Sequence, residues 1–506
     1  MKLKVLTYIL ASTCCISSCT KLDETLHSTV STGGIGSNNV DALLKGAYNA
    51  MRVPYQQQDG VWALQEHSTD ECLGPTRGGD WDDNGIWRVL HAHKWTADHA
   101  YVNNTFNNLG GVVFSSTDLL QYSPSASQAA QARFLRAFAM FDILDIWNQV
   151  PYRDPGESTV GASRVRKGSE ALDYIMSELN AIIKDLPDGP PANQANKDAA
   201  RVLLMKCYLN KGVIANRAAP TFDNADMAQV ITLADQIITS GRYKFSTDYF
   251  DNFAPDNDTK STENIFTANN VGGAEGGDVR SRWYMGLHYN QNPSGWNGFT
   301  TLSDFYNKFD AADKRRGESY PGMTDKSGIK AGFLIGQQYD QTGKALTDRK
   351  GHPLAFTAAV KIKETDPNTL EFTGIRVMKY TIDYASSDGT FANNDYVFYR
   401  YSDVLLMKAE AMLRSGNAAG GLTLVNQVRA ARNVTPFASL TLDNLLDELG
   451  REFYFECHRR TDLIRFGKFL DPWQEKDGTD DPKYLIYPIP NRQLAVNPNL
   501  EQNPGY

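Results

Sequence analysis

The chain has 506 residues, with 51 Lys and Arg against 59 Asp and Glu, and 41% of its residues are hydrophobic. This composition is that of a folded protein, and it excludes a disordered chain and a coiled coil. The formal net charge of −8 and the lack of a long Lys/Arg run argue against nucleic acid or anionic lipid as a partner. The length allows about three ordinary domains or one helical-repeat assembly.

Residues 1–18 have the pattern of a bacterial export signal. Two lysines precede an apolar stretch over 5–16, which is too short to span a bilayer. Small residues then lead up to Cys19, and this ending resembles a lipobox, in which the cysteine becomes the lipid-bearing first residue. A plain secretory signal is the alternative, but the polar residues after Cys19 favour a tether over 19–39. We therefore expect the lipid chains on Cys19 to anchor the protein to a membrane that it does not span.

Three cysteines remain beyond the predicted anchor: Cys72, Cys207 and Cys457. Their number is odd and none shows CxxC spacing, so the sequence indicates neither a disulfide framework nor a zinc cluster. We expect all three to be buried or free thiols.

Amphipathic helical patterns recur along both ends of the chain. Between residues 40 and 245 they predict several helices, three of which start at Ser169, Asp198 and Asp226, and a helical hairpin over 402–432 covers about one tetratricopeptide unit. Helix pairs of this kind cannot bury their apolar faces alone, so they stack on one another. The pattern predicts a mainly α scaffold of eight or nine helices, including helices near 40–53, 98–109, 127–147, 169–186, 198–208 and 226–241.

The middle of the chain has a different composition. Over 246–400 the helical period is lost, paired glycines appear and aromatic residues are frequent. Long loops in a compact protein are usually functional or disordered, and the aromatic content argues against disorder. The chain is thus predicted to consist of a first scaffold part (40–245), a loop-rich insertion with short strands that holds the ligand site (246–400), and a final helix pair with a C-terminal segment (401–506).

Several stretches resemble one family, the SusD/RagB-like outer-membrane lipoproteins of the Bacteroidetes. They occur in the family's order behind the lipobox-like ending, and they run the length of the chain. The stretches that carry the resemblance are Arg133–Phe138, Val150–Asp154, Tyr401–Ala411, Arg451–Arg465, Tyr487–Pro490 and Asn497–Tyr506.

The resemblance implies a protein of four tetratricopeptide-like units that is exposed on the outer-membrane surface by its lipid. It implies capture of a glycan and its delivery to a SusC-like TonB-dependent transporter, in a polysaccharide-utilisation system. No cofactor is expected, although structural calcium stays open because some members bind it. Most of the matching residues belong to the scaffold, so we assign Phe453–Phe455 and Arg459–Arg460 to packing and ion pairing.

Two segments have the residues that a sugar ring requires. A sugar offers an apolar face to an aromatic platform and a rim of hydroxyl groups to polar side chains. We predict Trp81 as a platform, and Trp283 and Trp296 as platforms or buried packing residues, whereas Trp62, Trp87, Trp95, Trp147 and Trp473 are assigned to the interior. The candidate ligand-binding residues are Arg77, Asp80, Trp81, Asp82, Asn84, Trp283, Tyr284, Trp296 and Asn297.

Three alternatives to a glycan site remain open at this point. Asp80, Asp82 and Asn84 have the spacing of an EF-hand calcium loop, but its twelfth position holds His91 where a bidentate glutamate is needed. The same scaffold could carry peptide or protein cargo, which would favour a deep charged groove over exposed tryptophans.

An all-α glycoside hydrolase is the third alternative. Such an enzyme needs two carboxylates about 5–9 Å apart across the scissile bond. Neighbouring carboxylates in one loop, such as Asp80 and Asp82, cannot easily flank a sugar from both sides. The chain has no Gly-x-Ser-x-Gly, HExxH or Walker motif. We therefore expect a binding protein with no catalytic residues.

Overall fold

The computed structural model describes residues 37–386 and 391–506. The predicted signal, the lipidation residue Cys19 and the tether up to residue 36 lie outside the described residues. The long helices are α2 (Ser37–Ala50), α6 (Ala100–Asp118), α7 (Ala126–Trp147), α8 (Gly168–Ile182), α9 (Lys197–Ala215), α10 (Asn224–Thr239), α15 (Tyr401–Arg414), α16 (Ala418–Ala431) and α17 (Leu442–Phe453).

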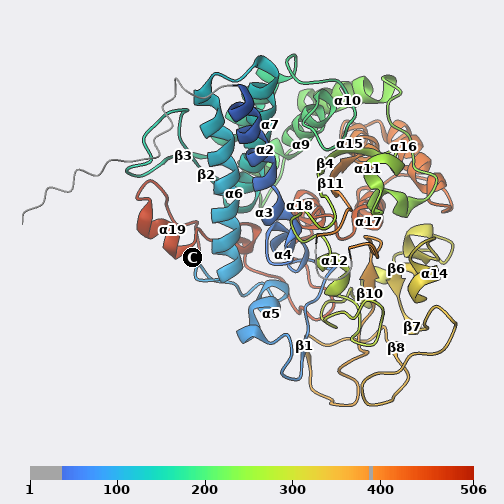
Figure 1. The fold of residues 1–506 in the computed structure, drawn as a ribbon. Helices are drawn as coiled ribbons and strands as arrows, with labels where there is room; N and C mark the ends of the chain where they lie inside the picture. Colours follow the sequence, from blue (N-terminus) through green and yellow to red (C-terminus); the bar gives the residue numbers. More distant parts are fainter. Residues whose placement is uncertain (1–36, 387–390) are drawn as a thin grey trace, which may run out of the picture.

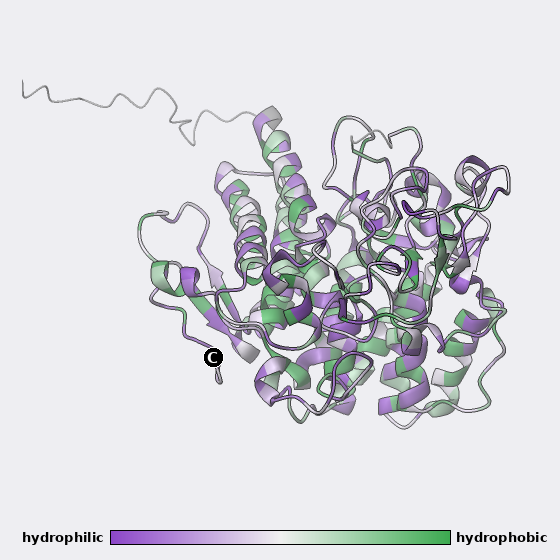
Figure 2. Cartoon of the chain, turned by 90° about the horizontal axis from the view of Figure 1, so that it is seen from below, coloured by the Kyte–Doolittle hydropathy of each residue, from purple (hydrophilic) through white to green (hydrophobic). Residues whose placement is uncertain are grey.

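These helices form one continuous stack (Figure 1). Helix α2 packs on α6 and α7, and the helices from α6 to α10 each pack on the next along the chain. Helix α10 then packs on α15, and α15 on α16, so the two ends of the chain belong to the same stack. Figure 2 shows apolar and polar residues alternating along the scaffold helices, as expected of helices with one buried face. The predicted mainly α helical-repeat scaffold is confirmed.

Helix α6 is longer than the sequence predicted. The sequence predicted a helix that ends near Leu109, before two glycines. Instead α6 continues through Gly110 and Gly111 to Asp118, because Val112 and Val113 beyond them are buried in the core. Burial of these side chains outweighs the low helix propensity of glycine, which is about 1 kcal/mol per residue.

The segment 246–400 contains short strands and helices, which are gathered on one side of the stack (Figure 1). Strands β4 (Asn264–Ala268) and β11 (Tyr396–Arg400) pair antiparallel, so the chain leaves and re-enters the scaffold at one place. Strand β6 (Ala331–Leu334) pairs antiparallel with both β10 (Arg376–Met378) and β5 (Gly317–Glu318). The other short elements here are α11 (Asn257–Lys260), α12 (Ser281–Tyr284), α13 (Ser303–Tyr306), α14 (Thr324–Ser327), β7 (Gly336–Gln337), β8 (Ala355–Phe356) and β9 (Lys363–Glu364).

The remaining elements join the N-terminal and C-terminal parts of the chain. Strand β1 (Thr76–Arg77) pairs parallel with β9, with Thr76 opposite Lys363. Strands β2 (Gln149–Tyr152) and β3 (Arg164–Lys167) form an antiparallel hairpin. These elements are α3 (Arg52–Gln56), α4 (Val61–Glu66), β1, the 3-10 turn η2 (Asp83–Gly85), α5 (Ile86–His91), η3 (Leu119–Tyr122), β2 (Gln149–Tyr152), β3 (Arg164–Lys167), α18 (Arg459–Arg465) and α19 (Asn491–Val496).

The core contains the aromatic residues assigned to it. Trp62, Trp87, Trp95 and Trp147 are buried, and Trp473 is partly buried against the same cluster. Helix α7 is buried over most of its surface, and its start is capped reciprocally by Ser125 and Gln128. Cys72 and Cys207 are buried and Cys457 is half-buried, all three as free thiols, as predicted.

A buried ion-pair cluster fastens the insertion to the last helices. Glu452 of α17 accepts from Arg400 at 2.5 Å, from Arg432 at 2.8 Å and from Arg315 at 2.9 Å. Phe453–Phe455 are buried beside it, and Arg459 pairs with Asp70 at 2.7 Å. The assignment of this segment to packing and ion pairing is confirmed. Within the described ranges, no helix is long and apolar enough to cross a membrane.

Candidate functional site

The two sequence segments that were predicted to hold the ligand site lie side by side. Leu73 and Thr300 form an antiparallel bridge, with N···O distances of 2.8 and 2.9 Å. Beyond the bridge, Nε1 of Trp81 donates to the carbonyl oxygen of Trp296 at 3.0 Å. Residues 215 positions apart in the sequence therefore meet in one surface.

The first loop is held in a strained conformation. After β1, the backbone N–H groups of Arg77 and Asp80 donate to each other's carbonyl oxygens at 2.8 and 3.1 Å. Trp81, Asp83 and Asn84 then adopt positive φ angles of 59°, 40° and 56°. Such angles cost non-glycine residues about 1–3 kcal/mol each, and strained residues concentrate at functional sites. The strain therefore favours a functional role for this loop.

The indole ring of Trp81 is half-buried. Its centroid lies 4.8 Å from that of Phe299 and 6.1 Å from that of Trp87, so its inner part packs on the core. Gly298 lies directly beneath it, and a Cβ there would be 2.5 Å from Cε2 of Trp81. The ring position is thus fixed by packing and by the hydrogen bond to Trp296, while part of the ring stays accessible.

Trp296 is the more exposed tryptophan, with 36% of its surface accessible. Its ring stacks on that of Tyr284, with centroids 5.5 Å apart and planes at 21°. Tyr284 is itself buried, so it supports the inner face of Trp296 and leaves the outer region of that ring to solvent. This arrangement makes Trp296 a rigid, flat apolar surface.

Polar side chains form a rim beside the two tryptophans. The hydroxyl group of Tyr289 donates to Asp80 at 3.4 Å, and the guanidinium group of Arg349 lies 3.9 Å from the centre of the Tyr289 ring. Arg349 also pairs with Glu371 at 2.7 Å, and Nε2 of His288 lies 2.8 Å from the other oxygen of Glu371. These contacts fix the orientation of each group before any ligand arrives.

The charge states in this rim follow from its hydrogen bonds. Burial lowers the pKa of His288, and the backbone N–H of Asn290 donates to its Nδ1 at 3.0 Å, so Nε2 carries the proton that Glu371 accepts. Burial alone would raise the pKa of Glu371, but hydrogen bonds from Arg349 and His288 outweigh it and lower that pKa. Glu371 is therefore ionised at neutral pH.

The other carboxylates of the first loop are held differently. Asp82 accepts from Arg88 at 2.6 Å and from Thr76 at 3.1 Å, and the hydrogen bond from Arg88 lowers its pKa. Its charge is thus engaged by side chains of the flanking elements β1 and α5. Asp80 and Asn84 are exposed in the same loop as Trp81.

Four predicted ligand contacts require correction because the side chains are buried. Trp283 has no accessible surface, and Tyr284 supports Trp296 from inside. The side chain of Asn297 accepts from Arg376 at 2.8 Å. These three residues therefore shape the surface from beneath it.

Arg77 is the fourth correction. Its guanidinium group donates to the carbonyl oxygens of Gly298, Leu370 and Thr373 at 2.8–3.1 Å. Burial lowers its pKa to about 10. Arg77 thus connects the first loop to the insertion, and its buried guanidinium group donates to the protein's own carbonyl oxygens.

His288, Arg349 and Glu371 were not predicted from the sequence as residues of this site. They come from irregular segments far apart in the chain, and no period or motif connects them. The frequency of aromatic residues around Tyr289 was the only signal in this region. In the described part of the chain, no group of three or more His, Cys, Asp or Glu side chains could hold a metal ion.

Comparisons with known proteins identify a family from the C-terminal half of the chain and find the same fold in solved structures. The family model described as SusD family matches residues 238–506, which is more than half of the chain. The chain belongs to the SusD family. Among curated SusD-family relatives, the starch-binding protein SusD of Bacteroides thetaiotaomicron is 26% identical over 519 aligned residues, covering 93% of this chain and 88% of that protein.

Solved structures of the SusD superfamily share the fold. A SusD superfamily protein from Parabacteroides distasonis superposes with a TM-score of 0.73 at 19% identity, covering 93% of this chain and 99% of that one. Surface glycan-binding protein A from Bacteroides thetaiotaomicron, solved in complex with laminarihexaose, gives 0.68 at 18% identity, with 92% and 99% covered. The resemblance stated from the sequence is confirmed.

Proposed function

We propose that the protein is a surface lipoprotein of the outer membrane that captures an oligosaccharide or polysaccharide and delivers it to a SusC-like TonB-dependent transporter. One observation carries this proposal: the indole N–H of Trp81 donates to the backbone carbonyl oxygen of Trp296 at 3.0 Å, which brings the two partly accessible tryptophans into one region of the surface. Aromatic faces beside polar side chains are the combination that sugar rings require.

The relatives support the same class of ligand. One is described as a starch-binding protein, and a second was solved with laminarihexaose. Because the identities are low, the likeness to solved structures supports the fold alone, and the choice of glycan depends on the loops of this chain. The lipid anchor on Cys19 and the transporter partner are carried over from the family as part of the proposal.

In the proposed complex, a sugar ring lies on the outer face of Trp296 and against the accessible edge of Trp81. Asp80 and Asn84 accept and donate hydrogen bonds to hydroxyl groups from one side. Arg349, which stacks on Tyr289 near Asp80, donates to a further hydroxyl group while Glu371 holds its position. Rings of this kind bind through many modest contacts, several of them through water.

We propose that capture involves no bond cleavage. A glycosidase needs one carboxyl group with a raised pKa to act as general acid. The pKa values of Asp82 and Glu371 are instead lowered by their cationic partners, so these two groups carry no proton to donate.

Titration of the lipid-free protein, residues 20–506, against a panel of soluble polysaccharides by affinity electrophoresis tests the proposal. We expect retardation by one class of polysaccharide with no release of reducing ends. Release of reducing ends would favour the hydrolase, and no retardation by any glycan would favour peptide cargo.

Two substitutions connect this result to the site. We expect Trp81→Ala and Trp296→Ala each to weaken binding at least tenfold while the protein keeps its fold. Trp81→Ala should also lower the melting temperature, because the inner part of this ring packs on the core. The control is Tyr339→Ala, because Tyr339 is an exposed aromatic residue of the insertion outside this cluster. Equal affinity of all three variants would show that the platform assignment is wrong.

A further inference from the structure

A pocket of about 570 Å³ lies in the insertion, close to the segment that carries Trp296. Its walls come mainly from three segments, 255–260, 320–326 and 381–385. These lining residues are distinct from those of the candidate site described above. The volume is within the range of protein sites that bind small ligands.

Tyr384 connects this pocket to the segment of Trp296. Its hydroxyl group donates to the carbonyl oxygen of Asn292 at 2.7 Å, and the side-chain amide of Asn292 donates to the carbonyl oxygen of Lys326 at 3.4 Å. Asn292 and Trp296 are four positions apart in the sequence, so the chain between them spans at most about 14 Å. One extended oligosaccharide can therefore contact both the outer ring of Trp296 and the pocket.

Tyr384 also gives the pocket an aromatic ring. The residue is half-buried, so part of it stays accessible in the wall of the pocket. The hydrogen bond to Asn292 fixes one end of the ring, and Nζ of Lys326 lies 5.4 Å from the ring centre. An aromatic ring with a hydrogen-bond donor beside it matches the apolar face and the hydroxyl rim of a sugar.

Hydrogen bonds hold the other polar side chains of the pocket in place. The hydroxyl group of Tyr320 donates to Asp251 at 2.8 Å and accepts from Nζ of Lys260 at 2.7 Å. The buried carboxylate of Asp383 accepts from both the backbone N–H and the side-chain amide of Asn393 at 2.8 Å. Because these groups are already ordered, a ligand that enters the pocket removes little of their conformational freedom.

Charge restricts the class of ligand. Asp256, Asp258 and Lys326 are all exposed and line the pocket. Lys260 is already paired with Asp251 at 3.2 Å. Two exposed carboxylates disfavour a sulfated or uronic-acid chain, because like charges repel. A hydroxyl group can both donate to a carboxylate and accept from Lys326, so the pocket suits an uncharged sugar.

We propose that this pocket is a further subsite for the captured glycan, in which one sugar ring lies against Tyr384 and its hydroxyl groups reach Lys326 and the exposed carboxylates. The ligand is then a neutral chain that runs from Trp296 past Asn292 into the pocket. This inference rests on the glycan capture proposed above. It adds that the protein holds an extended chain and distinguishes it from a short oligosaccharide by length.

Isothermal titration of the lipid-free protein with oligosaccharides of increasing length tests the proposal. The oligosaccharides are prepared from the polysaccharide that retards the wild type in affinity electrophoresis. We expect the affinity of the wild type to rise with length beyond the shortest oligosaccharide that binds. Tyr384→Ala should weaken binding of the longest oligosaccharide at least tenfold and that of the shortest less than twofold. Lys326→Gln, which changes an exposed side chain, should weaken binding of the longest oligosaccharide only.

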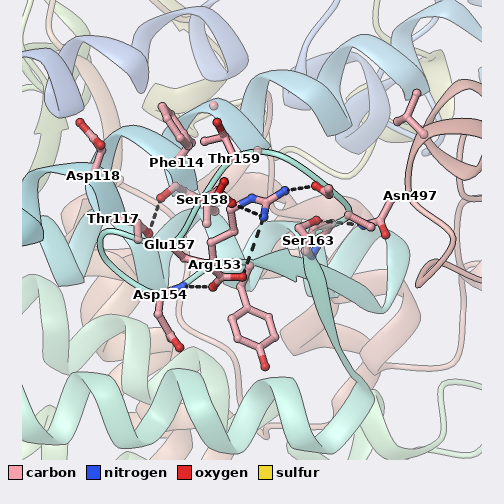
Figure 3. A pocket seen from close by; sticks show the side chains of 18 of the residues that line it. Phe114, Thr117, Asp118, Arg153, Asp154, Glu157, Ser158, Thr159, Ser163 and Asn497 are labelled. Atoms are coloured by element: carbon pink, nitrogen blue, oxygen red, sulfur yellow. Dashed lines mark hydrogen bonds and ion pairs between the residues drawn. The ribbon is translucent and has the colours of Figure 1, made fainter. Parts of the chain in front are cut away.

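Two further variants serve as controls. Tyr384→Phe removes the hydrogen bond to Asn292 and keeps the ring, so it should retain most of the gain in affinity with length. Phe114→Ala is the control for loss of an aromatic ring elsewhere. Phe114 is 52% exposed and lines a separate pocket of about 790 Å³ between α6 and the loop 153–163 (Figure 3). This variant should bind every oligosaccharide as the wild type does.

The possible results separate the two proposals. An affinity that does not rise with length, or a Tyr384→Ala variant that binds the longest oligosaccharide like the wild type, would overturn the subsite while glycan capture stands. Equal losses for short and long oligosaccharides in Tyr384→Ala and Tyr384→Phe would show that Tyr384 only positions the segment of Trp296, and would also overturn the subsite. Preference for a sulfated or uronic-acid chain would overturn the neutral ligand. Absence of binding to any glycan would overturn glycan capture and the subsite together.

Discussion

Gly298 offers a direct test of whether the position of the Trp81 ring determines glycan affinity. A Cβ at this position would lie 2.5 Å from Cε2 and Cζ2 of Trp81 and 3.0 Å from the carbonyl oxygen of Met285. The φ angle of Gly298 is outside the left-handed region, so an added methyl group acts through contact alone. We expect Gly298→Ala to displace the indole ring without removing any aromatic group.

The magnitude follows from the contacts. Overpacking a well-packed site costs about 1–3 kcal/mol, and loss of the hydrogen bond from Trp81 to Trp296 costs about 1 kcal/mol more. A sugar that covers about a third of a tryptophan buries roughly 80 Å² of it, which at about 25 cal/mol per Å² is worth about 2 kcal/mol. We therefore expect the affinity for the glycan to fall about thirtyfold.

Isothermal titration with the polysaccharide that binds the wild type measures this loss, and chemical denaturation measures stability. Gly79→Ala is the control in the same loop, because no described atom lies within 4 Å of a Cβ there. It should bind within twofold of the wild type. The double variant Gly298→Ala, Trp81→Ala should bind no more weakly than Trp81→Ala alone, because the two changes act on one ring. Wild-type affinity in a destabilised Gly298→Ala would refute the reasoning.

Three further predictions concern buried groups. Glu452→Gln should lower the free energy of unfolding by about 3 kcal/mol in chemical denaturation, because three buried guanidinium groups each lose one of their charged partners. Exposed Glu170→Gln should change it by less than about 0.5 kcal/mol, and equal losses would contradict this account. Burial raises the pKa of Asp403 to about 7. The folded state then holds a proton that the unfolded state releases above about pH 4, so this group costs stability as pH rises from 4 to 7. The denaturation midpoint of Asp403→Asn should accordingly increase relative to that of the wild type as the pH rises from 4 to 7. A difference that stays constant with pH would contradict this prediction. Trp283→Phe should bind the glycan within twofold of the wild type in the same titration. A large loss of affinity would indicate that Trp283 contacts the ligand.

Local patterns were sufficient for the scaffold. The apolar stripes of α8, α10 and α15 repeat with the helical period, and such a pattern has one low-energy arrangement, in which helices stack on their neighbours. The continuation of α6 past Gly110 was not predictable in this way, because burial of Val112 and Val113 depends on helices that lie elsewhere in the chain.

In the candidate site, too, some features follow from local sequence and others depend on distant segments. Residue types predicted Trp81 as a platform, since polar and glycine neighbours surround it in the sequence, and left Trp283 and Trp296 open between platforms and buried packing residues. Burial of Trp283 and Arg77 could not be read from those neighbours, because the atoms that cover them come from distant segments. Arg349 and Glu371 reach the rim for the same reason.

The family, the order of the helices and the two aromatic loops could all be read from the amino-acid sequence, because each is encoded by residues close together in the chain. Tertiary contacts alone decided which aromatic residues face solvent, which arginines are held inside, and how far α6 extends. Accessibility depends on what the rest of the chain places over a side chain, and that follows only from the complete packing of the molecule.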